Sequence, residues 1–127
     1  MIKKRILVSD RVRHPPCEGF SWIDRRFVHE FASRLTGDAL LLYFFLAAVS
    51  DKHGLSFYSD SSTAVRLRMG EQEMVAAREE LVIHDLVAYQ PPLTQVLSLP
   101  HGHVERRGLH GLQEVFRTLR EPEGRRR

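Results

Sequence analysis

The spacing of apolar residues predicts four helices within residues 24–84. Over residues 24–35 apolar side chains recur three and four positions apart, as Phe27, Phe31 and Leu35 do, which is typical of an amphipathic helix. Residues 39–50 are apolar almost all round, which indicates a helix buried centrally or shared with a partner chain. A short helix over 60–67 and a longer one over 71–84 follow, and the longer one is expected to turn Met74, Ala77 and Leu81 inward.

Three strand-like runs complete the pattern, at residues 55–58, 86–90 and 94–99. Pro91 and Pro92 separate the last two and suit the tip of a hairpin, where no ladder hydrogen bond is needed. Helix, tight turn, longer helix and β-hairpin is the order of a winged helix-turn-helix. The predicted fold class is therefore mostly α with a small antiparallel sheet (α+β), a winged helix-turn-helix.

The turns carry residues that support these boundaries. Gly54 can take the left-handed conformation after the apolar helix, and Ser59 or Asp60 can cap the next one. The turn between the last two helices needs a residue with positive φ, and Arg68 stands there at a cost of about 1 kcal/mol. Gly70 can then serve as the N-cap of the second helix.

Composition and apolar periodicity divide the chain into three expected segments. Residues 1–19 are basic and lack sustained periodicity, so they are expected to form an extended arm that Phe20 and Trp22 anchor on the core. Residues 20–100 form the winged helix-turn-helix domain. Residues 101–127 are expected to hold a short helix, with apolar residues from Leu109 to Leu119, and a basic tail.

Charge is unevenly distributed, although the chain of 127 residues has a net charge of only +3. Residues 1–34 carry +4, residues 35–100 carry −4 and residues 101–127 carry +3. If the protein binds DNA, its two ends are expected to neutralise most of the phosphates.

Several function classes find no support in the sequence. The single cysteine, Cys17, excludes an intramolecular disulfide and suits a reducing cytoplasm. The longest apolar run, 39–49, is about half the roughly 20 residues that a membrane span needs. His101 and His103 lack partners at recognised metal-ligand spacing, and no catalytic motif occurs. We expect a cytoplasmic protein that is not an enzyme and binds no cofactor, metal or membrane.

The chain resembles small bacterial winged helix-turn-helix DNA-binding proteins that are often associated with mobile elements. The resemblance covers roughly residues 5–100 and lies in FSWIDRR (20–26), ALLLYFFL (39–46), DKHGLSFY (51–58), AREEL (77–81), LVAY (86–89) and QVLSL (95–99). It implies a winged helix and work linked to DNA, such as transcription control, replication initiation or transposition. Two positions depart from the pattern: Thr63 replaces a common Ile, and Arg68 replaces the turn Gly.

The candidate DNA-binding residues form two groups. Gln72, Val75, Ala76 and, if it swings outward, Arg78 are expected to face the major groove, where Gln can bind adenine and the apolar residues can touch a thymine methyl. Phosphate contacts are expected from Lys3, Lys4, Arg5, Lys52, Ser59, Ser61, Ser62, Arg66, Arg68, Arg125, Arg126 and Arg127. The hypothesis is a transcriptional regulator or accessory factor of a mobile element that binds double-stranded DNA, as a homodimer or beside a partner protein such as a transposase or polymerase.

The alternative is a non-enzymatic adaptor subunit of a larger nucleoprotein complex, which uses the winged helix as a docking surface. The second helix opens with Glu71, Gln72 and Glu73, and an acidic face disfavours contact with phosphate. The apolar residues of 39–49 also suit a dimer interface or a docking surface.

Overall fold

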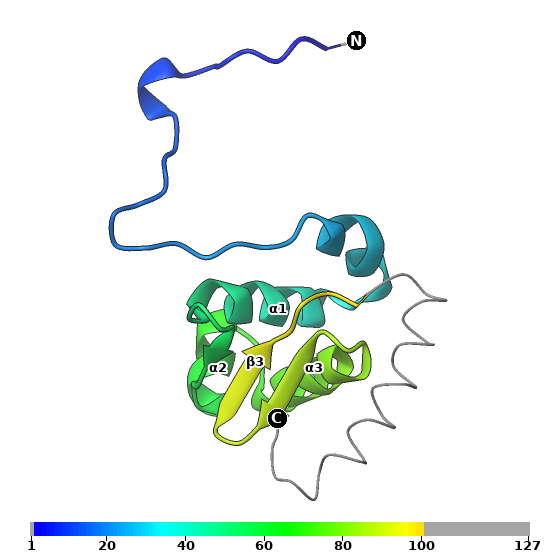
Figure 1. The fold of residues 1–127 in the computed structure, drawn as a ribbon. Coiled ribbons are helices and arrows are strands. Elements are labelled where there is room, and N and C mark those ends of the chain that lie inside the picture. The colour runs from blue at the N-terminus through cyan, green and yellow to red at the C-terminus, as the bar shows by residue number, and fades with distance from the viewer. Residues whose placement is uncertain (1, 101–127) are drawn as a thin grey trace, which may run out of the picture.

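Helices and a small sheet pack together in the computed structural model, which describes residues 2–100 (Figure 1). The α-helices are α1 (Gly37–Val49), α2 (Asp60–Leu67) and α3 (Glu71–Ile83). The strands β1 (Leu55–Ser56), β2 (Val87–Gln90) and β3 (Leu93–Val96) form an antiparallel sheet in the order β1-β3-β2. The predicted α+β class with a small antiparallel sheet is confirmed.

The core lies where α1 packs on α3, with β2 against α3 and β3 against α1. Met74, Ala77 and Leu81 are buried on the inner face of α3, as their spacing predicted. Leu86 and Val87 continue this apolar surface into the sheet. The wider cluster adds Phe27, Phe31, Ala39, Leu42, Tyr43, Phe45, Leu46, Ala64 and Leu99.

Local chemistry explains where α1 begins and where the chain turns after it. The hydroxyl of Thr36 accepts a hydrogen bond from the Ala39 N–H, which caps the first turn. After α1, Gly54 has φ +83°, and a Cβ there would lie 2.5 Å from the carbonyl oxygen of Val96. Gly54 is therefore required both by the left-handed backbone and by the close approach of the last residue of β3.

The helix predicted over 24–35 differs from the structure. The chain forms a π-helical turn, η2 (Phe27–Phe31), followed by a short 3₁₀ turn, η3 (Ala32–Arg34). Phe27 and Phe31 are both buried. Because they are four residues apart, they lie on the same side of an α-helical and of a π-helical turn. The apolar spacing therefore located the contact with the core correctly but could not distinguish a regular α-helix from this irregular winding.

The all-round burial expected for α1 is only partly present. One stripe, made of Leu41, Phe44 and Ala48, is exposed, and Phe44 retains 60% of its accessible surface. The other faces of α1 belong to the core.

The N-terminal arm leaves the body of the protein and has its own short 3₁₀ turn, η1 (Ser9–Arg11) (Figure 1). The expectation that Phe20 and Trp22 anchor it is wrong, since 67% and 77% of their surfaces are exposed. Ser21 makes the tether instead, because its hydroxyl donates to the Ala48 carbonyl at 2.9 Å.

None of the helices within residues 2–100 has the length and apolar character needed to cross a membrane. The helix expected between Leu109 and Leu119 lies outside the described residues, as do His101, His103 and the basic tail.

Candidate nucleic-acid interface

The helix pair α2–α3 is built by capping residues at both ends of α2. The Ser59 hydroxyl accepts a hydrogen bond from the Ser62 N–H at 3.0 Å and so caps the helix. Arg68 ends α2 in the left-handed conformation, with φ 60° and ψ 45°. This agrees with the prediction that the residue at this turn, commonly Gly, has a positive φ. Gly70 is the N-cap of α3, also as predicted.

Arg78 does not lie on the outer surface of α3. Its guanidinium donates to the carboxylate of Asp60 at 2.9 Å and lies 3.7 Å from the centre of the Tyr89 ring. Only 13% of the side chain is exposed. Arg78 therefore joins α2, α3 and β2, and a contact with guanine would require breaking both interactions.

Glu80 has a second structural role on α3. Its two carboxylate oxygens accept hydrogen bonds from the N–H and the hydroxyl of Thr36, at 2.8 and 2.7 Å. The same hydroxyl caps α1, so Glu80 fixes the start of α1 against α3.

The exposed face of α3 combines Gln72 and Ala76 with acidic residues. Both lie on the surface as expected, whereas Val75 is partly buried against the core. Three further exposed side chains are carboxylates: Glu71, Glu73 and Glu79. With Arg78 engaged, the exposed positions of α3 offer one amide for base reading, three negative charges and the apolar side chains of Val82 and Ile83.

Positive charge close to this face comes from α2 and the turn after it. Arg66 and Arg68 are exposed. Arg66 lies over the Tyr58 ring, 5.5 Å from its centre, and its Nε donates to the Ser62 hydroxyl at 3.4 Å. Ser61 is exposed and Ser62 partly buried, so hydroxyls and guanidinium groups lie together on α2.

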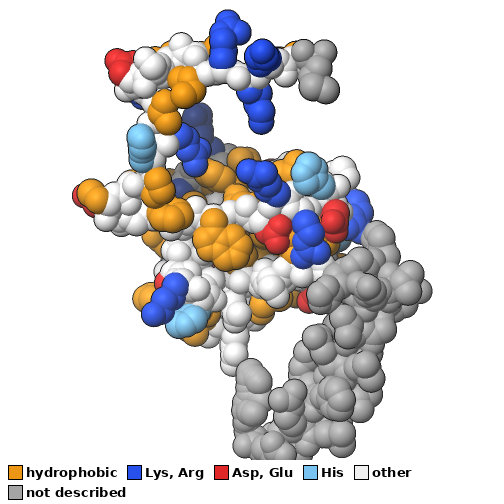
Figure 2. Space-filling model, turned by 45° about the horizontal axis from the view of Figure 1, so that its top comes forward, with side chains coloured by type: hydrophobic (Ala, Val, Ile, Leu, Met, Phe, Trp, Pro, Cys, Tyr) orange, Lys and Arg blue, Asp and Glu red, His pale blue; other side chains and the backbone are white. Residues whose placement is uncertain are grey.

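The other predicted cations are elsewhere. Lys3, Lys4 and Arg5 are exposed on the arm, and Figure 2 shows Lys and Arg side chains along it, apart from the body. Lys52 lies on the turn between α1 and β1 rather than on the α2–α3 pair. Arg125, Arg126 and Arg127 lie outside the described residues.

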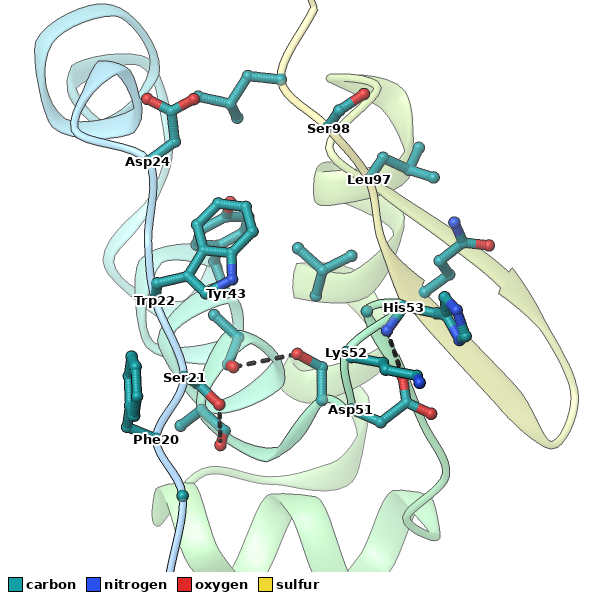
Figure 3. Close-up of a pocket in the computed structure, with 18 of the residues that line it drawn as sticks. Phe20, Ser21, Trp22, Asp24, Tyr43, Asp51, Lys52, His53, Leu97 and Ser98 are labelled. Carbon is teal, nitrogen blue, oxygen red and sulfur yellow. Dashed lines mark hydrogen bonds between the residues drawn. The ribbon is translucent and has the colours of Figure 1, made fainter. Parts of the chain in front are cut away.

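Lys52 lines a cavity of about 980 Å³ that sequence reasoning did not find. The cavity lies between the segment 18–26, the C-terminal half of α1 and the segment 95–99 (Figure 3). Trp22 and the buried Tyr43 contribute aromatic side chains to its wall, and Phe27 stacks on the Tyr43 ring at 3.9 Å. Phe20 and Trp22 are two aromatic residues that stand before the first periodic apolar run, and they are the sequence signal that could have indicated the cavity.

Two ionisable groups beside this cavity have shifted pKa values. Burial, with a smaller contribution from the negative charge of Asp24, raises the pKa of Tyr43 above 10.0. The backbone N–H groups of Leu55 and His53 donate to the Asp51 carboxylate and lower its pKa below 3.8. At neutral pH, Tyr43 is therefore an uncharged hydroxyl and Asp51 a carboxylate that holds the turn.

Comparisons of the chain with protein-family models, curated proteins and solved structures find no match.

Proposed function

We propose that this protein is a winged-helix protein that binds duplex DNA, with α2–α3 as its helix-turn-helix and the β2–β3 hairpin as its wing. The observation that carries the proposal is the α2–α3 pair itself. Its left-handed turn at Arg68 sets an exposed helix, bearing Gln72 and Ala76, beside the exposed Ser61, Arg66 and Arg68. A helix that enters the major groove beside a helix that contacts the backbone is how such pairs bind DNA.

The acidic residues of α3 limit how specifically the protein binds DNA. Two unit charges separated by roughly 6 Å repel by about 0.7 kcal/mol in water before screening. Three carboxylates on the exposed face therefore oppose close contact with phosphate, and the cations of the arm and of α2 must offset them. The protein is accordingly proposed to have a low ratio of specific to non-specific affinity. The resemblance to proteins of mobile elements supports a role as a regulator or accessory factor of such an element.

Fluorescence anisotropy with labelled duplexes tests the proposal. The full chain is titrated into a random-sequence duplex and into duplexes selected from a randomised pool at low salt. Gln72→Ala should cost about 1–3 kcal/mol on the selected site and leave random DNA unchanged. Ser33→Ala, which removes an exposed polar side chain from η3, should change neither. Failure of the full chain to bind any duplex at low salt would refute the proposal.

A docking role remains the second candidate, because the exposed face of α3 carries carboxylates and no unengaged cation among the described residues. Under this alternative, α3 binds a basic surface of a partner protein in a nucleoprotein complex. Replacing Glu71, Glu73 and Glu79 by Gln separates the two. The triple variant should bind DNA more tightly if α3 enters the groove, and should lose its protein partner if α3 is a docking surface.

A further inference from the structure

The cavity beside Trp22 has the form of a groove between two extended segments. Residues 20–24 run along one side and residues 95–99 along the other, and α1 closes the base (Figure 3). A volume of about 980 Å³ is far more than one side chain requires. A segment of polypeptide is a suitable occupant in size.

Backbone groups on one side of this groove lack partners, whereas on the other side the N–H groups of Val96 and Leu97 and the carbonyl of Leu99 are already bonded. Within residues 2–100, the N–H and C=O groups of Phe20, Ser21, Trp22 and Ile23 form no hydrogen bond, and neither do those of Ser98. Extended segments with unpaired backbone groups are where a further strand is added. The groove therefore matches a ligand that carries regularly spaced backbone donors and acceptors.

The Tyr43 hydroxyl is a second, independent observation. Tyr43 is 97% buried and lines the cavity, yet no described residue makes a hydrogen bond to its hydroxyl. Buried hydroxyls normally have a partner, because an unsatisfied polar group costs free energy. A backbone carbonyl placed in the groove supplies such a partner.

The N-terminal arm contains apolar side chains and backbone groups that lack packing and hydrogen-bond partners. Ile6, Leu7 and Val8 are each between 55% and 81% exposed, and their only hydrogen bond to another described residue is the local one that the Val8 carbonyl accepts from Arg11. Three consecutive exposed apolar residues of this kind favour a strand that packs on something else. The exposed Trp22 ring at the groove provides an apolar surface for them (Figure 3).

The charges of the two parts are also complementary. Residues 1–19 hold five Lys or Arg and two Asp or Glu, which gives +3. Residues 20–100 hold seven and ten, which gives −3. Because the arm of this chain points away from its own body (Figure 1), the geometry favours a groove on another molecule.

We infer that the protein forms a homodimer by arm exchange, in which residues 6–8 of each copy lie as an extended strand in the groove between residues 20–24 and 95–99 of the other copy. Trp22 and the Tyr43 hydroxyl contact the incoming strand. Lys3, Lys4 and Arg5 precede the paired residues and stay available for other contacts. The inference does not rest on DNA binding and is tested without DNA.

Trp22 is the only tryptophan of the chain, so its fluorescence reports on the groove directly. In the full chain, raising the protein concentration should shift the emission to the blue, with the midpoint at the monomer–dimer transition measured by sedimentation. The variant Ile6→Ser/Leu7→Ser/Val8→Ser should remain monomeric and red-emitting at every concentration. Its folding is not at risk, since the arm does not pack on the body. Val65→Ser, which removes an equally exposed apolar side chain from α2, should dimerise as the wild type does.

Addition of a peptide of residues 1–13 to the triple variant should restore the blue shift, and the same peptide with the three Ser replacements should not. Three results would overturn the inference. One is a dimer that survives the triple replacement. Another is a blue shift in a monomer, which means that the arm folds onto its own groove. The third is quenching of Trp22 by single-stranded DNA without any response to the peptide, which identifies the ring as a platform for bases.

Discussion

The role of a single residue could be predicted from the sequence where local geometry determines it, and not where a tertiary contact does. Arg78 was expected to reach DNA only by swinging outward, and its side chain is instead held by Asp60 and Tyr89. A partner 18 residues away on another helix and a ring on a strand cannot be inferred from helical spacing. Arg68, by contrast, is set by local geometry, and its left-handed conformation was predicted from the turn alone.

Replacement by glycine should have opposite effects on the free energy of unfolding at Arg68 and at Arg66. Arg68→Gly should stabilise the protein by about 0.5–1 kcal/mol, because glycine adopts φ 60° without strain. Arg66→Gly, two residues earlier inside α2, should destabilise it by about 1 kcal/mol through lost helix propensity. Urea unfolding of both variants measures the difference, and a loss of stability in Arg68→Gly would contradict the strain argument.

At the scale of elements, sequence predicted those parts that local signals determine. The positions of α1, α2 and α3 follow from apolar spacing and from caps at Thr36, Ser59 and Gly70. The strands are shorter than the runs that indicated them, because β1 pairs over only Leu55 and Ser56. The winding of η2 and η3 and the bond from Thr36 to Glu80 depend on tertiary contacts, which no local pattern encodes.

The contact of Thr36 with Glu80 should be measurable as a coupling between α1 and α3. Thr36→Ala removes the helix cap and the hydroxyl's bond to Glu80 but keeps the bond from the Thr36 N–H, and should cost about 1–2 kcal/mol. Glu80→Ala removes only the interhelical part. A double-mutant cycle should give a coupling of about 0.5–3 kcal/mol, since the two residues are in direct contact. Thr36 paired with Glu79→Ala, a carboxylate on the exposed face, is the control and should be additive.

At the scale of the whole molecule, charge and apolar surface are both segregated. The arm is basic while the body of 20–100 is acidic, and the stripe of Leu41, Phe44 and Ala48 leaves α1 apolar on one exposed face. The sequence alone showed the asymmetry of charge. It also left two explanations for the apolar helix α1, burial in the core or contact with a partner chain. It did not indicate the groove at Trp22, because that site depends on segments about 75 residues apart lying on either side of α1.

The segregation of charge predicts how DNA affinity depends on salt. Each phosphate neutralised contributes a slope of about 0.9 in log affinity against log salt concentration. Replacing Lys3, Lys4 and Arg5 by Gln should therefore lower the slope by up to about 2.7, and deletion of residues 1–8 together with 124–127, which removes six cations, by up to about 5. Arg34→Gln is the control and should leave the slope unchanged, because the Arg34 guanidinium is already engaged by the Glu30 carbonyl and the Phe31 ring.

The charge-only replacement keeps Ile6, Leu7 and Val8 in place, so sedimentation of this variant shows how far the positive charge of the arm contributes to dimer formation. If the Gln variant keeps the wild-type slope while the deletion loses affinity, the arm acts through its apolar residues alone. If both keep the wild-type affinity and slope, the acidic body binds DNA without the help of the arms. In that case the compensation proposed for the carboxylates of α3 must come from Arg66 and Arg68 on the neighbouring helix and turn.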